Sequence, residues 1–191
     1  MHDNTTKDKI IQTMYELVAQ KGYDKTSIGQ ISDAIGIKKA SVYYYFKSKE
    51  EIFLALVRAL YANDGLAGSE LFRADIGPAE YKEQLIAAGN DFIDAYFENS
   101  DLHKVYAEID LQTTRIPALK EIAKTADQNL QQFFCRCIGH GIAAGALPQE
   151  FDVKLNAQVL YAVFIGLDEA ILYDLPIEPK AVWREVISKL F

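Results

Sequence analysis

The sequence has few of the residues on which most catalytic and metal sites depend. Its 191 residues include two cysteines and three histidines, and no histidine has a second ligand at a spacing such as H-x-x-x-H. The chain also lacks G-x-S-x-G, a Walker loop and a dinucleotide-binding glycine pattern. We therefore expect no enzyme activity, no cofactor and no metal site.

The low cysteine count excludes a disulfide framework. Cys135 and Cys137 lie two residues apart on a predicted helix, so their side chains point to different faces and do not readily pair with each other. We interpret them as buried, unreactive thiols, with a redox sensor as the alternative. Two unpaired cysteines fit a reducing cytoplasm, which is the localisation we expect.

Long apolar segments are also missing. No run of 18 apolar residues is free of charge, so we expect no membrane span. The N-terminal MHDNTTKDK lacks the apolar core of a secretory signal. No alternating strand pattern and no internal repeat is present, whereas half of the residues are hydrophobic, which is ample for a core. The sequence predicts an all-α chain of about nine helices.

Charge is distributed unevenly along the chain. Residues 1–50 contain eight Lys/Arg and six Asp/Glu, whereas residues 51–191 contain twelve and twenty-one, which gives balances of +2 and −9. A basic balance suits contact with nucleic acid, whereas a domain that is held away from the DNA need not be basic. We therefore predict that residues 1–47 form a DNA-reading head and that residues 48–191 form an acidic ligand-binding and dimerisation body. A helix over 48–62 would connect the two.

The stretch TSIGQISDAIGIKKASVYYYF, residues 26–46, reads as two short helices joined by a turn at Gly36. Thr26 or Ser27 can cap the first helix, isoleucines at helical spacing give it one apolar face, and Gly36 supplies the left-handed residue that ends it. Two helices joined by a short glycine turn are typical of a helix-turn-helix, whose second helix enters the DNA major groove.

The charge and hydroxyl pattern of this stretch fits DNA. Four lysines and no acid lie between Ile35 and Lys49, and lysines neutralise phosphates while hydroxyls donate to phosphates or bases. The alternative is a solvated helix with ordinary surface lysines, which the glycine turn and the aromatic run disfavour. The predicted DNA-binding residues are Thr26, Ser27, Lys38, Lys39, Ala40, Ser41, Tyr43, Tyr44, Tyr45 and Lys49.

This stretch, continued by KSKEEIF, closely resembles the helix-turn-helix of the TetR family of bacterial transcriptional repressors. Lys38, Ala40 and Tyr45 depart from the family pattern on the reading surface, so they bear on the operator and not on the fold. The resemblance is strong over residues 7–60 and architectural beyond. The matching positions are Thr26, Ile31, Gly36, Ile37, Tyr43, Phe46, Lys49 and Ile52.

The resemblance implies how such a protein works. Family members read a palindromic double-stranded DNA operator, dimerise through their last two long helices and release DNA when a small molecule binds inside the body. The lysine that matches Lys49 contacts backbone phosphate in the family. In this chain the resemblance implies that Thr26, Ser27 and Lys49 contact the DNA backbone, while the helix after Gly36 reads the major groove.

Helical periodicity, caps and prolines predict the remaining elements. Residues 63–77 read as a loop or a short helix. The predicted helices span about residues 6–21, 48–62, 78–97, 102–113, 117–144 and 152–173, with a last one after Pro179.

The helix over 152–173 is too apolar for a fully solvated face, and its small residues allow another helix to approach closely. It is either the central core helix of the body or part of an interface. We favour a homodimer through about residues 152–191.

The body is rich in aromatic side chains, with acids placed among them. Aromatic and acidic groups together suit an aromatic or cationic effector, whereas ordinary core aromatics and solvated acids are the alternative. The candidate ligand-binding residues are Phe92, Tyr96, Tyr106, Asp110, Phe133, Tyr161, Phe164 and Asp168.

These observations favour a ligand-responsive repressor. Two alternatives stay open: an activator or ligand-independent regulator with the same head, and a helical ligand-binding or interaction module that does not bind DNA.

Overall fold

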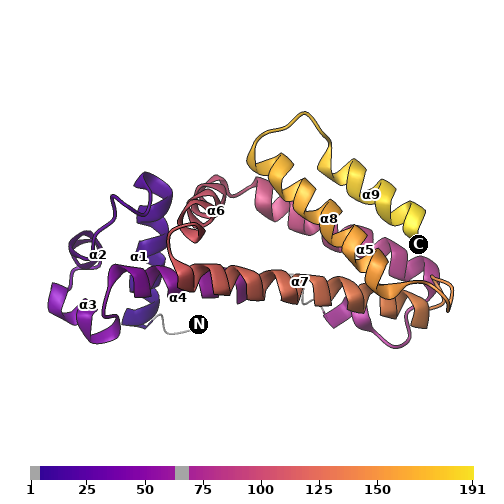
Figure 1. The fold of residues 1–191 in the computed structure, drawn as a ribbon, viewed down its shortest axis with the longest axis horizontal. Coiled ribbons are helices and arrows are strands. Elements are labelled where there is room, and N and C mark those ends of the chain that lie inside the picture. The colour runs from indigo at the N-terminus through magenta and orange to yellow at the C-terminus, as the bar shows by residue number, and fades with distance from the viewer. Residues whose placement is uncertain (1–4, 63–68) are drawn as a thin grey trace. The chain divides into compact units, whose positions relative to one another are not determined.

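The computed structural model describes residues 5–62 and 69–191, and in these the chain forms nine α-helices, one 3₁₀ turn and no strand (Figure 1). The predicted all-α class is confirmed. Part of the predicted loop over 63–77 lies outside the described residues. The elements are α1 (Thr6–Lys21), α2 (Ile28–Ala34), α3 (Lys39–Tyr45), α4 (Lys49–Ala62), η1 (Ser69–Phe72), α5 (Pro78–Phe97), α6 (Ser100–Thr113), α7 (Pro117–Ala143), α8 (Val153–Leu172) and α9 (Pro179–Leu190).

Local signals set the helix ends close to where the sequence predicts them. Thr5 caps α1 in a capping box with Asp8, and Gly22 ends it at φ +81°, a conformation that favours glycine. Prolines occupy the first position of α5 and α9, where their missing N–H costs nothing.

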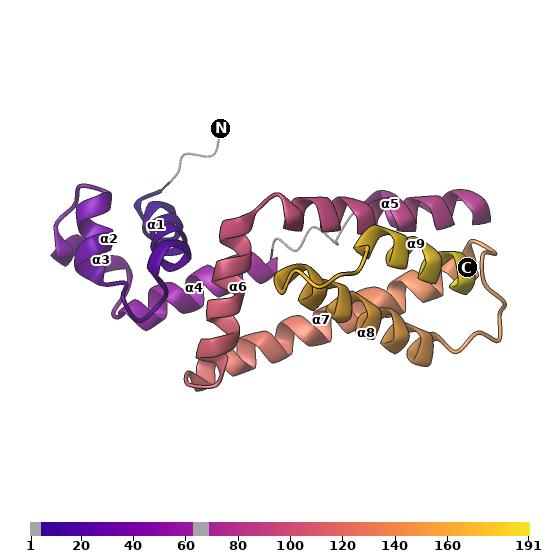
Figure 2. The same cartoon turned by 90° about the horizontal axis from the view of Figure 1, so that it is seen from above.

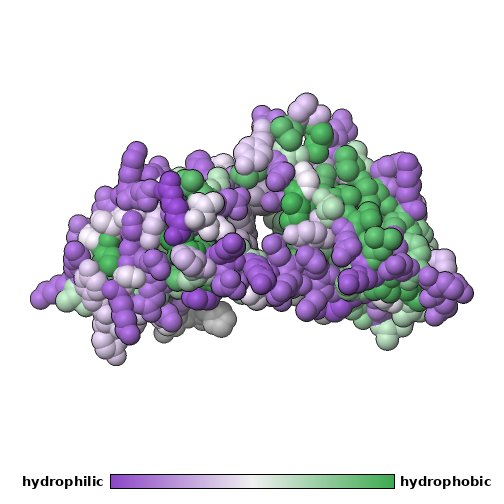
Figure 3. All heavy atoms as spheres, viewed as in Figure 1, coloured by the Kyte–Doolittle hydropathy of each residue, from purple (hydrophilic) through white to green (hydrophobic). Residues whose placement is uncertain are grey.

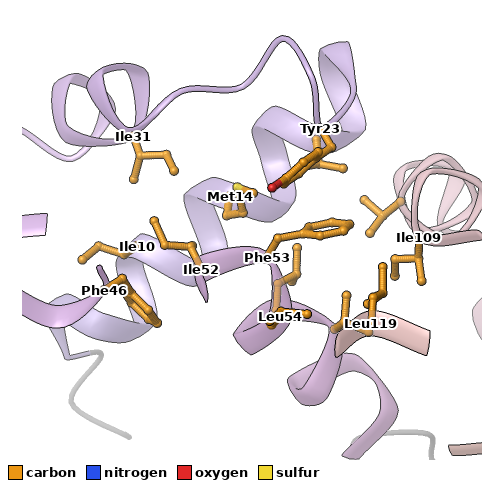
Figure 4. Packing of buried hydrophobic residues seen from close by; sticks show 14 of the residues in the cluster. Ile10, Met14, Tyr23, Ile31, Phe46, Ile52, Phe53, Leu54, Ile109 and Leu119 are labelled. Atoms are coloured by element: carbon orange, nitrogen blue, oxygen red, sulfur yellow. The ribbon is translucent and has the colours of Figure 1, made fainter. Parts of the chain in front are cut away.

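A first compact unit contains α1 to α4, α6 and the start of α7 up to Lys124. Its core is a single cluster of buried aliphatic and aromatic side chains (Figure 4). Ile10, Met14 and Ile52 are fully buried in it, and the rings of Tyr23 and Phe53 lie 4.6 Å apart. By its contacts, α4 belongs to the same unit as the helices that precede it. The proposed domain boundary at 47/48 stays a prediction.

A second compact unit contains α5, α7 from Thr125 onward, α8 and α9. In it α9 lies along α5 (Figures 1 and 2). The two helices approach closely because the Trp183 indole sits on Gly89: a Cβ on that glycine would lie 2.0 Å from Trp183 Nε1. Trp183 Nε1 donates to the Leu85 carbonyl at 3.2 Å, which satisfies its only polar atom.

The outer face of α8 is apolar and exposed. Leu155 and Val159 are 57% and 44% exposed, and hydrophobic residues gather over the face of the second unit where α8 and α9 lie (Figure 3). By length and composition alone, Val153–Leu172 is apolar enough to cross a membrane, and 33% of its most apolar window is buried. A single helix of this kind does not establish a membrane span, because the core helix of a globular protein can have the same length and composition, and the expectation of no membrane span stays a prediction.

The fit between Trp183 and Gly89 yields a stability prediction. Gly89→Ala should lower the free energy of unfolding by about 1–3 kcal/mol, because the new methyl group overlaps an indole that is 3% exposed and cannot swing away. Gly139→Ala is the matched control: it is also in a helix, but a Cβ there meets nothing within 4 Å. The control should be neutral or stabilising by up to about 1 kcal/mol. Urea unfolding followed by Trp183 fluorescence compares them, and equal midpoints would contradict the packing account.

Candidate nucleic-acid interface and apolar cavity

Hydrogen bonds and one glycine fix the geometry of the α2–α3 pair. Ser27 caps α2 in a capping box with Gln30, which confirms the predicted N-cap. Gly36 has φ +70°, as its place at the end of the helix requires, and Ile37 N–H donates to the Ser32 carbonyl at 3.0 Å. The chain therefore turns sharply into α3.

The inner face of α3 is anchored in the core of the first unit. Val42 is fully buried and Phe46, which ends the helix, is 3% exposed. Because α3 is short, burying these two side chains turns the intervening positions outward. Tyr44 is 84% exposed, and its ring meets that of Tyr45 edge-on at 5.1 Å.

The structure brings seven of the ten predicted DNA-binding residues together on the exposed surface of α3. No acid lies in α3 or in the segments that join it to α2 and α4. The N-cap residue Lys38 is exposed and makes no side-chain cap hydrogen bond. The seven residues are Lys38, Lys39, Ala40, Ser41, Tyr43, Tyr44 and Tyr45.

The other three predicted residues lie apart from this surface, at the turn that precedes α2 and at the start of α4. Thr26 is 2% exposed, and its hydroxyl donates to the Gly22 carbonyl at 2.9 Å. Ser27 is exposed but uses its hydroxyl in the cap. Lys49 Nζ lies 3.0 Å from the Tyr23 carbonyl oxygen and 4.0 Å from the centre of the Tyr23 ring. Their roles in DNA binding stay predictions.

Two cations near α3 are absent from the predicted set. Lys47 is exposed directly after Phe46, and Lys7 Nζ of α1 lies 5.7 Å from the Phe46 ring centre. Lys47 belongs to the four-lysine run, so the sequence contained the signal for it. The approach of Lys7 depends on how α1 packs, which periodicity alone does not determine.

The second unit holds a small apolar cavity between α5, α8 and α9. Its volume is about 10 Å³, roughly what one water molecule needs. Three of the predicted ligand-binding residues line it, namely Phe92, Phe164 and Asp168. The full lining is Gly89, Phe92, Ile93, Phe164, Leu167, Asp168, Ile171 and Trp183.

The remaining candidate ligand-binding residues do not line this cavity. Tyr96 and Phe133 are buried in the second unit. Burial raises the pKa of Tyr161, as does the nearby Asp127 carboxylate on α7. Tyr106 and Asp110 lie on α6, in the first unit, and Asp110 is exposed.

Trp183 and Gly89 are cavity residues that sequence reasoning missed. Trp183 is the only tryptophan of the chain, and helical periodicity assigns it simply to an amphipathic last helix. A glycine inside the otherwise regular helix α5 was the available signal, because helix glycines cost stability and often mark a close approach.

Comparison with known proteins places the N-terminal stretch in a family. Residues 10–56 match the model of "Bacterial regulatory proteins, tetR family". Residues of the chain are 51% identical over 47 positions to the biofilm operon icaADBC HTH-type negative transcriptional regulator IcaR of Staphylococcus epidermidis. That alignment covers 25% of this chain and 25% of the relative, so it concerns the helix-turn-helix region alone.

Solved structures extend the likeness in fold to almost the whole chain. A TetR transcription regulator from Haloarcula marismortui superposes with a TM-score of 0.77 at 22% identity, covering 96% of this chain and 95% of that one. A transcriptional regulator from Saccharomonospora viridis in complex with choline gives 0.71 at 19% identity, covering 96% and 93%. At these identities the likeness concerns the fold. The matched family is one of regulatory proteins, in agreement with the expectation that the chain is not an enzyme.

Proposed function

The chain belongs to the tetR family of bacterial regulatory proteins, and from this premise we propose that it is a transcriptional repressor that binds a palindromic operator as a homodimer and leaves it when a small molecule binds. A repressor of this kind works where the DNA is, so the proposal includes a cytoplasmic location. A relative that its helix-turn-helix region matches, IcaR of Staphylococcus epidermidis, is a negative regulator, which supports repression over activation.

One observation carries the DNA-binding part of the proposal: α3 presents lysines, hydroxyls and tyrosine rings on one acid-free surface while Val42 and Phe46 hold it from behind. Lysines supply the sequence-independent attraction to phosphate. Ser41 and the tyrosine hydroxyls can donate to base edges, and the Ala40 methyl can meet a thymine methyl. The interface therefore combines attraction to phosphate with groups that can read sequence.

A second copy of the chain is the proposed partner of the exposed face of α8. Leu155, Val159, Ala162 and Gly166 are exposed and recur at spacings of four, three and four residues, the pattern of a helix–helix seam. A Cβ on Gly166 would meet nothing within 4 Å in the protomer, so no packing inside one chain requires this helix glycine. Close approach of a partner helix accounts for it. A dimer also supplies the two heads that a palindromic site requires.

The effector is proposed to enter beside Phe92, Phe164 and Asp168. A cavity of about 10 Å³ is far smaller than the several hundred Å³ of a typical ligand site, so binding has to spread α5, α8 and α9. Such a ligand distinguishes two states of the body, which is what a shift in operator affinity requires. The aromatic faces and the Asp168 carboxylate suit an aromatic or cationic compound.

The reading helix is tested by the double substitution Lys39→Ala with Tyr43→Ala. We expect operator affinity to fall by roughly 100-fold or more, since removing one base or phosphate interaction costs about 1–3 kcal/mol. Sedimentation should show the same dimer. Lys124→Ala removes an exposed lysine of α7 and should bind as the wild type. Unchanged anisotropy titrations for the double variant would refute the assignment of α3.

The α8 interface is tested by Val159→Asp. A carboxylate buried in the seam without a partner should raise the dimer dissociation constant by at least about tenfold. Gln158→Asp adds the same charge at the neighbouring exposed position, about 100° away around the helix, and should leave the dimer intact. Analytical ultracentrifugation measures both constants. A Val159→Asp variant that dimerises as tightly as the wild type would place the interface elsewhere.

The effector site can be followed through Trp183, because this single tryptophan lines the cavity. Aromatic ammonium compounds that enter should change its fluorescence and weaken operator binding at the same concentrations. Asp168→Asn should weaken binding of such cations at least about tenfold, by loss of the charge interaction. Ammonium compounds that bind the wild type and Asp168→Asn equally well would contradict the proposed role of the Asp168 carboxylate.

A further inference from the structure

Lys7 begins the core-facing stripe of α1, where the sequence has a lysine in place of an apolar residue. Ile10, Met14 and Val18 follow it at spacings of three, four and four residues, and all three are buried. Residues at these spacings share one face of a helix. Lys7 itself is exposed, because it precedes the first buried residue of that face. A lysine at such an edge can lay its stem along the apolar surface while its ammonium group stays in water.

Phe46 is the core residue beside which the Lys7 ammonium group lies. The Phe46 ring belongs to the same core cluster as Ile10 (Figure 4), and Lys7 Nζ is 5.7 Å from the centre of that ring. Phe46 is also the residue at which α3 ends. The packing of α1 therefore places a cation from outside the helix-turn-helix beside the C-terminal end of the proposed reading helix.

Lys47 provides a second cation at the same end. The chain is extended at Phe46, with φ −141° and ψ 130°, so that neighbouring side chains point to opposite sides. Because the Phe46 side chain is buried, Lys47 points outward, and it is exposed. Lys38 and Lys39 are exposed at the other end of α3. Exposed lysines therefore flank this helix at both ends.

The charges of Lys7 and Lys47 are not neutralised within the part of the chain that the structure describes. There, neither ammonium group has a hydrogen bond or an ion pair. The acids close to them in sequence are Asp8, Glu50 and Glu51. Asp8 and Glu51 accept backbone N–H groups at the starts of α1 and α4 instead. Both ammonium groups are therefore available to an outside anion.

DNA phosphate is the anion that this place on the molecule favours. A helix with its side chains is about 10–12 Å across, and the major groove is about 12 Å wide. A reading helix therefore fills the groove, and groups beside its ends meet the phosphates that wall it. Lysines neutralise such phosphates and release their counterions.

We propose that Lys7, together with Lys47, binds backbone phosphate beside the C-terminal end of α3, so that the DNA interface extends beyond the helix-turn-helix onto α1. This contact rests on the proposed DNA-binding function. Lys7 lies outside residues 10–56, which match the family model, so the contact is a property of this chain and not of the matched motif.

The test compares Lys7→Gln with Lys9→Gln in the full chain, on the duplex that the wild type enriches from a random pool. Both lysines are exposed on α1 and both variants lose one positive charge, but Lys9 lies about 200° around the helix from Lys7. Anisotropy titrations across a salt series measure the slope of log affinity against log salt concentration, at temperatures well below unfolding.

Lys7→Gln should make this slope shallower by about 0.9 for each phosphate contact that is lost, and should lower affinity about three- to tenfold near about 0.1 M salt. Lys47→Gln should do the same. Lys9→Gln should keep the wild-type slope, and so should Lys7→Arg, because arginine retains the charge.

Phosphate ethylation of the same duplex locates the contact. Ethylating the phosphates that Lys7 binds should weaken binding of the wild type and have little further effect on Lys7→Gln. A role of Lys7 in packing alone would not produce this pattern, because the same phosphates would then matter equally to both proteins.

Other outcomes overturn the proposal and leave the proposed function intact. A wild-type slope in Lys7→Gln, with or without a lower unfolding temperature, would limit Lys7 to packing on Phe46. Equal changes in Lys7→Gln and Lys9→Gln would report net charge and no specific contact, and a wild-type slope in Lys47→Gln would overturn the pairing of the two lysines.

Failure of the proposed function looks different, because the wild type itself would then enrich no duplex. That result would overturn the phosphate contact together with the function on which it rests.

Discussion

The surface that α3 presents depends on the burial of Val42 and Phe46 in the core of the first unit. A helix of this length has too few intrahelical hydrogen bonds to hold its own conformation in water, so packing decides both that it forms and which way it faces. Ile31 of α2 and Ile10 and Ile52 of the neighbouring helices, all fully buried, complete the support. With α3 held in this way, the side chains of Lys39, Ser41 and Tyr44 face solvent, where they are available to a ligand.

The second unit depends on a different constraint, which is close approach. The Trp183 indole occupies the place of a side chain at Gly89, and the same indole lines the cavity between α5, α8 and α9. Any compound that enlarges the cavity must move a side chain that also fixes α9 on α5. The proposed effector site and the proposed dimer helices therefore share one packing interaction, and a signal can pass between them without leaving this unit.

Much of this could be predicted from sequence because the governing interactions are local. Ser27, Gly36 and Pro78 mark helix ends by their own chemistry, and apolar spacing identifies the inner faces of the helices. The partners of Lys49 could not be predicted, because they depend on where the carbonyl oxygens of a turn twenty-five residues away come to lie. Composition groups Tyr106 with the body, but α6 packs in the first unit, and no periodicity assigns a helix to one unit or another.

The central claim is that this chain reads DNA with paired α3 helices. Selection of binding sites from a pool of random duplex DNA with the purified wild-type protein tests it most directly. The account predicts enrichment of an inverted repeat whose half-site centres lie about one helical turn, or a whole number of turns, apart. Enrichment of no sequence, or of a single unrepeated half-site, would contradict it.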